Sequence, residues 1–150
     1  MVETVEVSRE LAQKVLTVVD AGLVSGLGKP IPGQMCVEAA VNYAIGADHG
    51  DNPSCVGKAV CAFKIRLNDA AWPTNKDRTK GMRKLAIAQL GSDKIDQKQF
   101  AAYVVIETVK RILPIALRAA GSVIQAHQQA LELAAGMCEA VVDLASARSA

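Results

Sequence analysis

Apolar positions in this sequence recur every three or four residues over most of its length, and strict alternation of apolar and polar residues is scarce. This period is typical of helices that pack through one face. A first helix is predicted over residues 8–25, with Ser8 as its N-cap and with Gly26 and Gly28 ending it. Its buried face is expected to hold Leu11, Val15, Val18, Val19 and Leu23.

Two further helices are predicted on either side of a polar turn at residues 48–52. The first begins near Gln34 and ends at Gly46, because glycine commonly follows the last helical residue. The second is expected to take Asn52 as its N-cap, with Pro53 at its first position. Its buried face should hold Val56, Val60, Phe63 and Leu67.

The second half of the chain predicts three more helices. Thr74 and Asp77 have the spacing of a capping box and mark the start of the next helix. A helix over residues 96–113 follows, and Pro114 should break or kink it. Residues 115–148 then predict one long helix, with an interruption at Gly121 or Gly136 as the alternative. Its small residues suit close packing inside the bundle or against a second copy.

The expected fold class is therefore all-α, a single-domain bundle of about six helices with a long C-terminal helix. A chain of 150 residues fits one domain. Within it, residues 33–91 form the motif-bearing core and residues 96–148 form the C-terminal helices. Apolar residues make up 51% of the sequence and aromatic residues only 3%, which favours an aliphatic core.

Cysteine usage and charge indicate a compartment and a class of partner. The four cysteines lack C-x-x-C spacing, and no apolar run reaches the roughly 18 residues that span a membrane. The N-terminal residues also lack the pattern of a secretory signal. We therefore expect a cytoplasmic protein with reduced thiols and no membrane partner. The net charge is only +2, but residues 55–84 carry eight basic residues against two acidic ones, which favours an anionic partner.

A thiol enzyme is one interpretation of the stretch between residues 33 and 69. Cys36 and Cys55 both fall in predicted first turns, where the helix dipole stabilises a thiolate. If the chain is an enzyme, the candidate catalytic residues are Cys36, His49 and Asp51. However, His49 lies beyond the far end of the helix that carries Cys36, and Cys36 shares a face with apolar residues. A buried structural thiol is therefore the favoured interpretation.

The same stretch could hold a metal ion if the ends of its two helices converge. The candidate ligands would be Cys36, His49, Asp51 and Cys55. Their spacing matches no standard structural zinc pattern, so we predict no metal and no cofactor. The polar residues expected to cap helices and stabilise turns instead are Asp51, Asn52, Asn68 and Asp69.

Three motifs stand out in this stretch: Met35-Cys36, Asp51-Asn-Pro53-Ser-Cys55-Val56 and Asn68-Asp69. With this combination, the chain resembles a group of short, uncharacterised bacterial proteins over residues 33–91. The group brings no established activity, so the resemblance implies no role for any residue. In many of its members an acidic residue stands one position after Glu38, where this chain has Ala39, and this difference argues against a catalytic role for Glu38.

A basic helix face is predicted just after Trp72. The residues that share this face are Lys76, Lys80, Arg83 and Lys84. Trp72 could stack on a base or a sugar while Arg66 or Arg78 meets a phosphate. The predicted ligand-binding residues are thus Arg66, Trp72, Lys76, Arg78, Lys80 and Arg83. A solvated face without a ligand is the alternative, and duplex nucleic acid is disfavoured by the small overall charge.

Together these observations predict a non-enzymatic, cytoplasmic helical module. It is expected to bind an anionic, nucleotide-like small ligand or a partner protein and to form a homo-oligomer. One alternative is a cysteine-dependent hydrolase or transferase that uses Cys36, and another is a structural or assembly protein.

Overall fold

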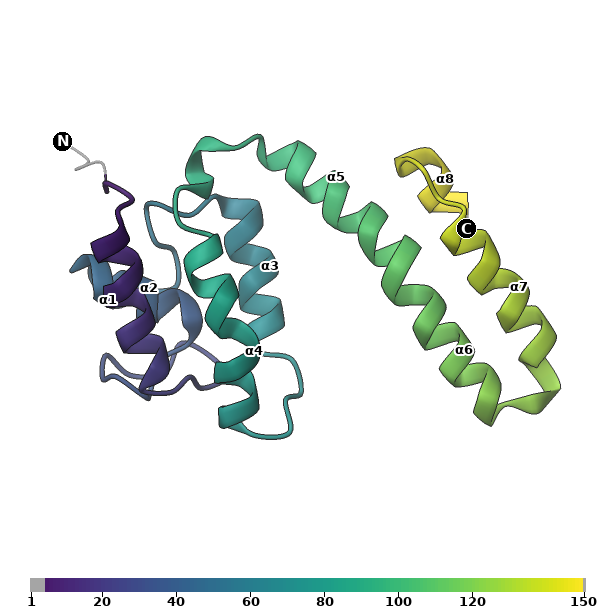
Figure 1. The fold of residues 1–150 in the computed structure, drawn as a ribbon, viewed down its shortest axis with the longest axis horizontal. Coiled ribbons are helices and arrows are strands. Elements are labelled where there is room, and N and C mark those ends of the chain that lie inside the picture. The colour runs from purple at the N-terminus through teal and green to yellow at the C-terminus, as the bar shows by residue number, and fades with distance from the viewer. Residues whose placement is uncertain (1–4, 150) are drawn as a thin grey trace. The chain divides into compact units, whose positions relative to one another are not determined.

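The computed structural model describes residues 5–149 as helices joined by loops, with no strand in that range (Figure 1). The all-α class predicted from the sequence is confirmed. The chain divides into two compact units at residues 97 and 98, close to the expected start of the C-terminal helices. The prediction of one domain for the whole chain is not tested by this division. No helix within residues 5–149 has the length and apolar character needed to cross a membrane.

The N-terminal unit is built around its second helix. Its main helices are α1 (Arg9–Asp20), α2 (Val37–Ile45), α3 (Lys58–Asn68) and α4 (Asn75–Ala88), followed by a short 3₁₀ turn, η1 (Ser92–Lys94). Helix α2 packs against the other three, and α4 also packs against α1 and α3 (Figure 1). Residues 37–42 of α2 are all buried, which is typical of a helix surrounded on every side.

The predicted starts of α1 and α4 are confirmed by their side-chain caps. The Ser8 hydroxyl accepts the N–H of Leu11 at 3.1 Å. The Thr74 hydroxyl accepts the N–H of Asp77 at 3.1 Å and donates to the Asp77 carboxylate at 2.7 Å. The expected buried face of α1 is also confirmed, and it consists of Leu11, Val15, Val18 and Val19, with Leu23 buried in the following loop.

Glycines in the left-handed region end two of the elements. Gly46 follows α2 with φ of 75°, as predicted. The predicted end of α1 is wrong, because the chain already turns at Gly22 (φ 124°) and α1 stops at Asp20. In the loop that follows, Gly28 (φ 74°) is so close to the Gln34 carbonyl oxygen that a Cβ atom would collide with it.

Helix α3 begins at Lys58 and not, as predicted, at Pro53. Pro53 accepts the N–H of Val56 at 3.0 Å and forms a separate turn. Gly57, rather than Asn52, is the N-cap, and its own N–H is donated to the Ser92 hydroxyl at 3.0 Å. Cys55 consequently lies in the turn before the helix.

The buried face of α3 also differs from the prediction. It consists of Val60, Cys61, Lys64 and Asn68, while Phe63 is 39% exposed. Val60 is buried as predicted, and so is Val56 in the turn before the helix. The other buried positions include the polar residues Lys64 and Asn68, which apolar periodicity alone could not identify.

The C-terminal unit forms a helical hairpin in place of the predicted long helix. Its elements are α5 (Gln97–Glu107), the π turn η2 (Thr108–Ile112), α6 (Leu113–Val123), the 3₁₀ turn η3 (Gln125–His127), α7 (Gln128–Glu139) and α8 (Leu144–Ser149). Helix α6 ends where Ile124 leaves the helical region (φ −102°, ψ 76°). Helix α7 then runs back along α6 (Figure 1).

A break at Pro114, one of the two predicted outcomes, does not occur, because the preceding turn is a π turn. The N–H of Leu113 is donated to the Thr108 carbonyl, five residues back. The backbone passes from α5 through η2 into α6 without a loop, and Pro114 occupies the first turn of α6, where a missing N–H is tolerated.

Substitution of two glycines by alanine should separate backbone strain from steric collision. Gly46→Ala places a side chain in open space at positive φ, so we expect it to lower the free energy of unfolding by about 1 kcal/mol. Gly28→Ala adds a collision with the Gln34 carbonyl, so we expect a loss of more than about 3 kcal/mol. Urea denaturation followed by circular dichroism measures both losses. Equal losses would contradict the close approach at Gly28.

Candidate functional site

A surface groove of about 690 Å³ lies between the end of α1 and the first turns of α4. Its walls include Asp20 at the end of α1, Gly22 in the loop that follows, and four charged residues of α4, which are Lys76, Asp77, Lys80 and Arg83. Half of the six predicted ligand-binding residues therefore line one groove.

The wall between the two helices is fixed by hydrogen bonds to Thr79. Its hydroxyl donates to the Asn75 carbonyl at 2.9 Å within α4. The same hydroxyl accepts the N–H of Leu23 at 2.9 Å, which holds the loop after α1 against α4. Hydrogen bonds within the fold therefore hold the two sides of the groove in place.

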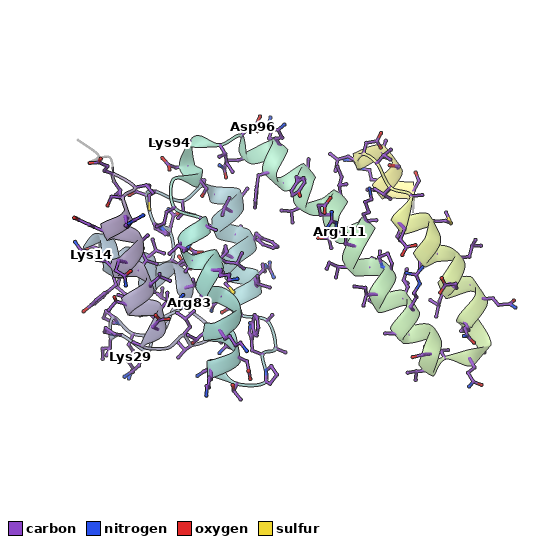
Figure 2. The ribbon with its side chains drawn as sticks, in the orientation of Figure 1. Lys14, Lys29, Arg83, Lys94, Asp96 and Arg111 are labelled. Atoms are coloured by element: carbon purple, nitrogen blue, oxygen red, sulfur yellow. The ribbon has the colours of Figure 1, made fainter. Side chains whose placement is uncertain are left out.

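The basic residues of the groove differ in their availability to a ligand. Arg83 donates to both carboxylate oxygens of Asp20, at 2.6 and 2.9 Å, and lies between α1 and α4 (Figure 2). These bonds lower the pKa of Asp20. Lys76 and Lys80 are exposed and form no ion pair with any residue that the structure describes. Lys76 also lies in the first turn of α4, near the positive end of the helix dipole. Because neither lysine is ion-paired, these two charges are available to an anion.

Arg78 and Trp72 have structural contacts that were not foreseen. Arg78 is 6% exposed, donates from Nε to the Asn68 carbonyl at 2.7 Å, and also bonds to the side chain of Asn75. The Trp72 indole donates to the Leu67 carbonyl at 2.9 Å, and its ring packs so closely on α4 that a Cβ atom at Gly81 would collide with it. Neither side chain lines the groove.

Arg66 is exposed on α3 and also lies outside the groove. Of the six predicted ligand-binding residues, only Lys76, Lys80 and Arg83 line the groove, and their role in binding stays a prediction.

The candidate thiol centre is not assembled as predicted. Cys36 is the N-cap of α2, and its sulfur accepts the N–H of Ala39 at 3.4 Å. Only 5% of Cys36 is exposed, and burial raises the pKa of its thiol. His49 is exposed, and its Nε2 atom lies 3.2 Å from the Gly28 carbonyl oxygen, with no hydrogen bond to the thiol. Cys36 and His49 therefore do not form an activated thiol–imidazole pair.

The four candidate metal ligands are also not brought together. Across residues 5–149, no group of three or more histidine, cysteine, aspartate or glutamate side chains has a geometry that could hold a metal. Cys55 is buried, and burial raises the pKa of its thiol. Asp51 is exposed and contributes its backbone carbonyl, which accepts the Cys61 thiol at 2.9 Å.

Asn68 and Asp69 have the structural role that was predicted, but with different partners. Asn68 is fully buried at the end of α3; its Oδ1 atom accepts the N–H of Val37 at 3.2 Å and its Nδ2 atom donates to the Val24 carbonyl at 2.9 Å. The Asp69 carboxylate accepts the N–H of Gly26 at 2.7 Å. This bond is among those that lower the pKa of Asp69 against the opposing effect of burial. The pair therefore holds the loop before α2 and the first turn of α2.

A buried polar cluster of Glu38, Lys64 and Gln89 was not predicted. Glu38 is fully buried, and its Oε1 atom lies 3.7 Å from Nζ of Lys64, which donates to the Leu85 carbonyl at 3.1 Å. Neither the Glu38 carboxylate nor the Gln89 amide has a hydrogen-bond partner of good geometry among the described residues. A cavity of about 20 Å³ next to Glu38 has room for one water molecule.

Burial raises the pKa of Glu38 to about 7, and Lys64 and Gln89 offset only part of this effect. The same burial lowers the pKa of Lys64. The sequence did contain a signal for the cluster, since Glu38 is a lone acid within the apolar run 35–41.

Comparison with protein-family models, with curated proteins and with solved structures finds no match for this chain. The resemblance to the bacterial group stays a prediction. The class established by the structure is that of an all-α protein, in which the conspicuous cysteines of residues 33–69 are buried.

Glu38 should make stability depend on pH in a defined direction. Its pKa is about 7 in the folded state against 4.5 ordinarily, so the folded state retains the proton more strongly. The associated stabilisation is complete below about pH 4.5 and is lost as the pH rises through about 7, a decrease of up to about 3 kcal/mol. Lys64 acts with the opposite sign, because its lowered pKa adds stability as the pH rises towards its ordinary 10.5.

Urea denaturation at a series of pH values measures this dependence. The decrease between pH 4.5 and 7 should disappear in Glu38→Gln and persist in Asp48→Asn, which changes an exposed acid. An unchanged pH profile in Glu38→Gln would rule out Glu38 as its source.

Proposed function

We propose that this protein is a non-enzymatic module that binds a small anionic ligand in the groove between α1 and α4. The observation that carries the proposal is the pair of exposed lysines, Lys76 and Lys80, one helical turn apart on the wall of that groove. Arg83 adds a third cation, although Asp20 neutralises much of its charge. A ligand with phosphate or carboxylate groups fits this arrangement best.

The proposal is narrower than the expectation from the sequence. Trp72, which was expected to stack on a base, lies outside the groove and is used in packing against α4. The groove could therefore recognise the phosphate groups of a nucleotide but offers no aromatic side chain to stack on its base. Lys76 and Lys80 act as point charges on flexible stems, so the interaction should be strongly dependent on salt.

The alternative of a thiol enzyme has less support. A nucleophilic cysteine requires a thiolate that is accessible to its substrate, and Cys36 is buried with a raised pKa. Its sulfur is occupied as the cap of α2.

Charge reversal in the groove should test the binding proposal. With inorganic pyrophosphate as the probe, we expect Lys76→Glu with Lys80→Glu to weaken binding at low salt by at least about tenfold, since both attractions become repulsions. Lys14→Glu, which makes the same change on α1 away from the groove, should leave binding nearly unchanged. Isothermal titration calorimetry measures the affinities. Equal affinity of the double variant and the wild type, or no binding by the wild type, would contradict the proposal.

Thiol reactivity should separate the binding module from the enzyme. All four cysteines are buried, so iodoacetamide at neutral pH should modify the native protein more than about tenfold more slowly than the denatured protein. Mass spectrometry of digested samples reports each site. Rapid modification of Cys36 in the native protein, with the other three thiols protected, would favour the enzyme instead.

A further inference from the structure

The walls of the groove between α1 and α4 carry two carboxylates, Asp20 and Asp77. Asp77 lies in the first turn of α4, where the helix dipole favours an acid. Its carboxylate accepts the Thr74 hydroxyl at 2.7 Å, and its N–H is donated to the same hydroxyl at 3.1 Å. The capping of α4 therefore accounts for Asp77.

Asp20 has no such explanation within its own helix. It is the last residue of α1, and the last turn of α1 holds no basic residue. The dipole of a helix favours cations at this end and opposes an acid. The partner of Asp20 lies instead on α4, because Arg83 donates from Nε and Nη2 to its two carboxylate oxygens at 2.6 and 2.9 Å. The reason for a carboxylate at this position therefore lies in the groove and not in α1.

The contact between Asp20 and Arg83 has the geometry of anion binding. An arginine binds a carboxylate or a phosphate through two parallel N–H···O bonds, and Asp20 accepts two such bonds. Its carboxylate thus occupies donors of Arg83 that a bound anion would use. Arg83 follows Lys80 by three residues on the same face of α4, so an anion held by the lysines lies next to it.

The ion pair is exposed, and the fold does not depend on it. The side chains of Arg83 and Asp20 are 45% and 47% exposed, and exposed ion pairs stabilise folded proteins only weakly. The loop after α1 is held against α4 separately, because the Thr79 hydroxyl accepts the N–H of Leu23 at 2.9 Å. Arg83 can therefore exchange Asp20 for an anion without separating the two helices.

We propose that Asp20 is an internal competitor of the ligand, which holds Arg83 until an anion binds in the groove and takes its place. This role rests on the proposed function of the groove and adds a regulatory contact to it. The apparent affinity for an anion is reduced by the fraction of molecules in which Arg83 is released. Asp20 therefore weakens the binding of every anion that uses Arg83, and its removal should strengthen that binding.

Isothermal titration calorimetry of the full chain with inorganic pyrophosphate tests the competition through a cycle of variants. Asp20→Asn in the wild type removes both a repulsion and the competitor, whereas in the Arg83→Gln variant it removes only the repulsion. We therefore expect the gain in affinity from Asp20→Asn to be at least about threefold larger when Arg83 is present. Glu10→Gln removes an exposed acid of α1 outside the groove and should leave the affinity nearly unchanged.

The outcomes separate this role from the proposed function. Each variant should retain the helical circular dichroism of the wild type, since the substituted side chains are exposed or half-exposed. Equal gains from Asp20→Asn in the two backgrounds, with pyrophosphate bound by the wild type, overturn the competition and leave the binding function intact. A gain from Glu10→Gln as large as that from Asp20→Asn also overturns it, because net charge alone would then be responsible. A wild type that does not bind pyrophosphate overturns the proposed function, and the role of Asp20 with it.

Discussion

The N-terminal unit depends on the buried side chain of Asn68. Its amide bonds to the first turn of α2 and to the loop before it, and its backbone carbonyl accepts the Arg78 guanidinium of α4. One residue at the end of α3 therefore joins three other parts of the unit. All these partners are buried or half-buried, so a variant that removed the amide would leave donors and acceptors unsatisfied, which costs more than the bonds themselves contribute.

This network gives a physical account of the conspicuous motif residues. Met35, Cys36, Cys55 and Val56 are all at most 5% exposed, and Pro53 is fully buried. The cysteines and polar residues of the stretch 33–69 thus mainly pack and cap α2 and α3. The exposed basic side chains lie elsewhere, on the first turns of α4.

Local features of the sequence predicted the parts of the fold that are determined locally. The caps at Ser8 and Thr74 and the glycine at Gly46 act within a few residues of themselves, and these predictions are confirmed. The predicted start of α3 and the predicted break at Pro114 were wrong, because distant or non-standard hydrogen bonds decide these features. Three of the six predicted ligand-binding residues line the groove, because helical spacing places Lys76, Lys80 and Arg83 together. Only the packing shows that Arg78 and Trp72 instead contact other parts of the N-terminal unit. The apolar run around Glu38 indicated that its carboxylate is buried, but helical spacing alone could not identify Lys64 of α3 as its partner.

The π turn before Pro114 couples two features of the sequence that otherwise look unrelated. A π turn accommodates one residue more than an α turn, so the side chains of α6 are rotated by about 100° from those of an uninterrupted helix. Deleting one residue from 108–112 would restore regular α-helical hydrogen bonding and rotate Arg118 of α6 away from Glu132 and Glu139 of α7. It would also set the pyrrolidine ring of Pro114 against the carbonyl four residues before it. The proline and the additional residue are therefore matched, and removing both should disturb the helix less than removing the additional residue alone.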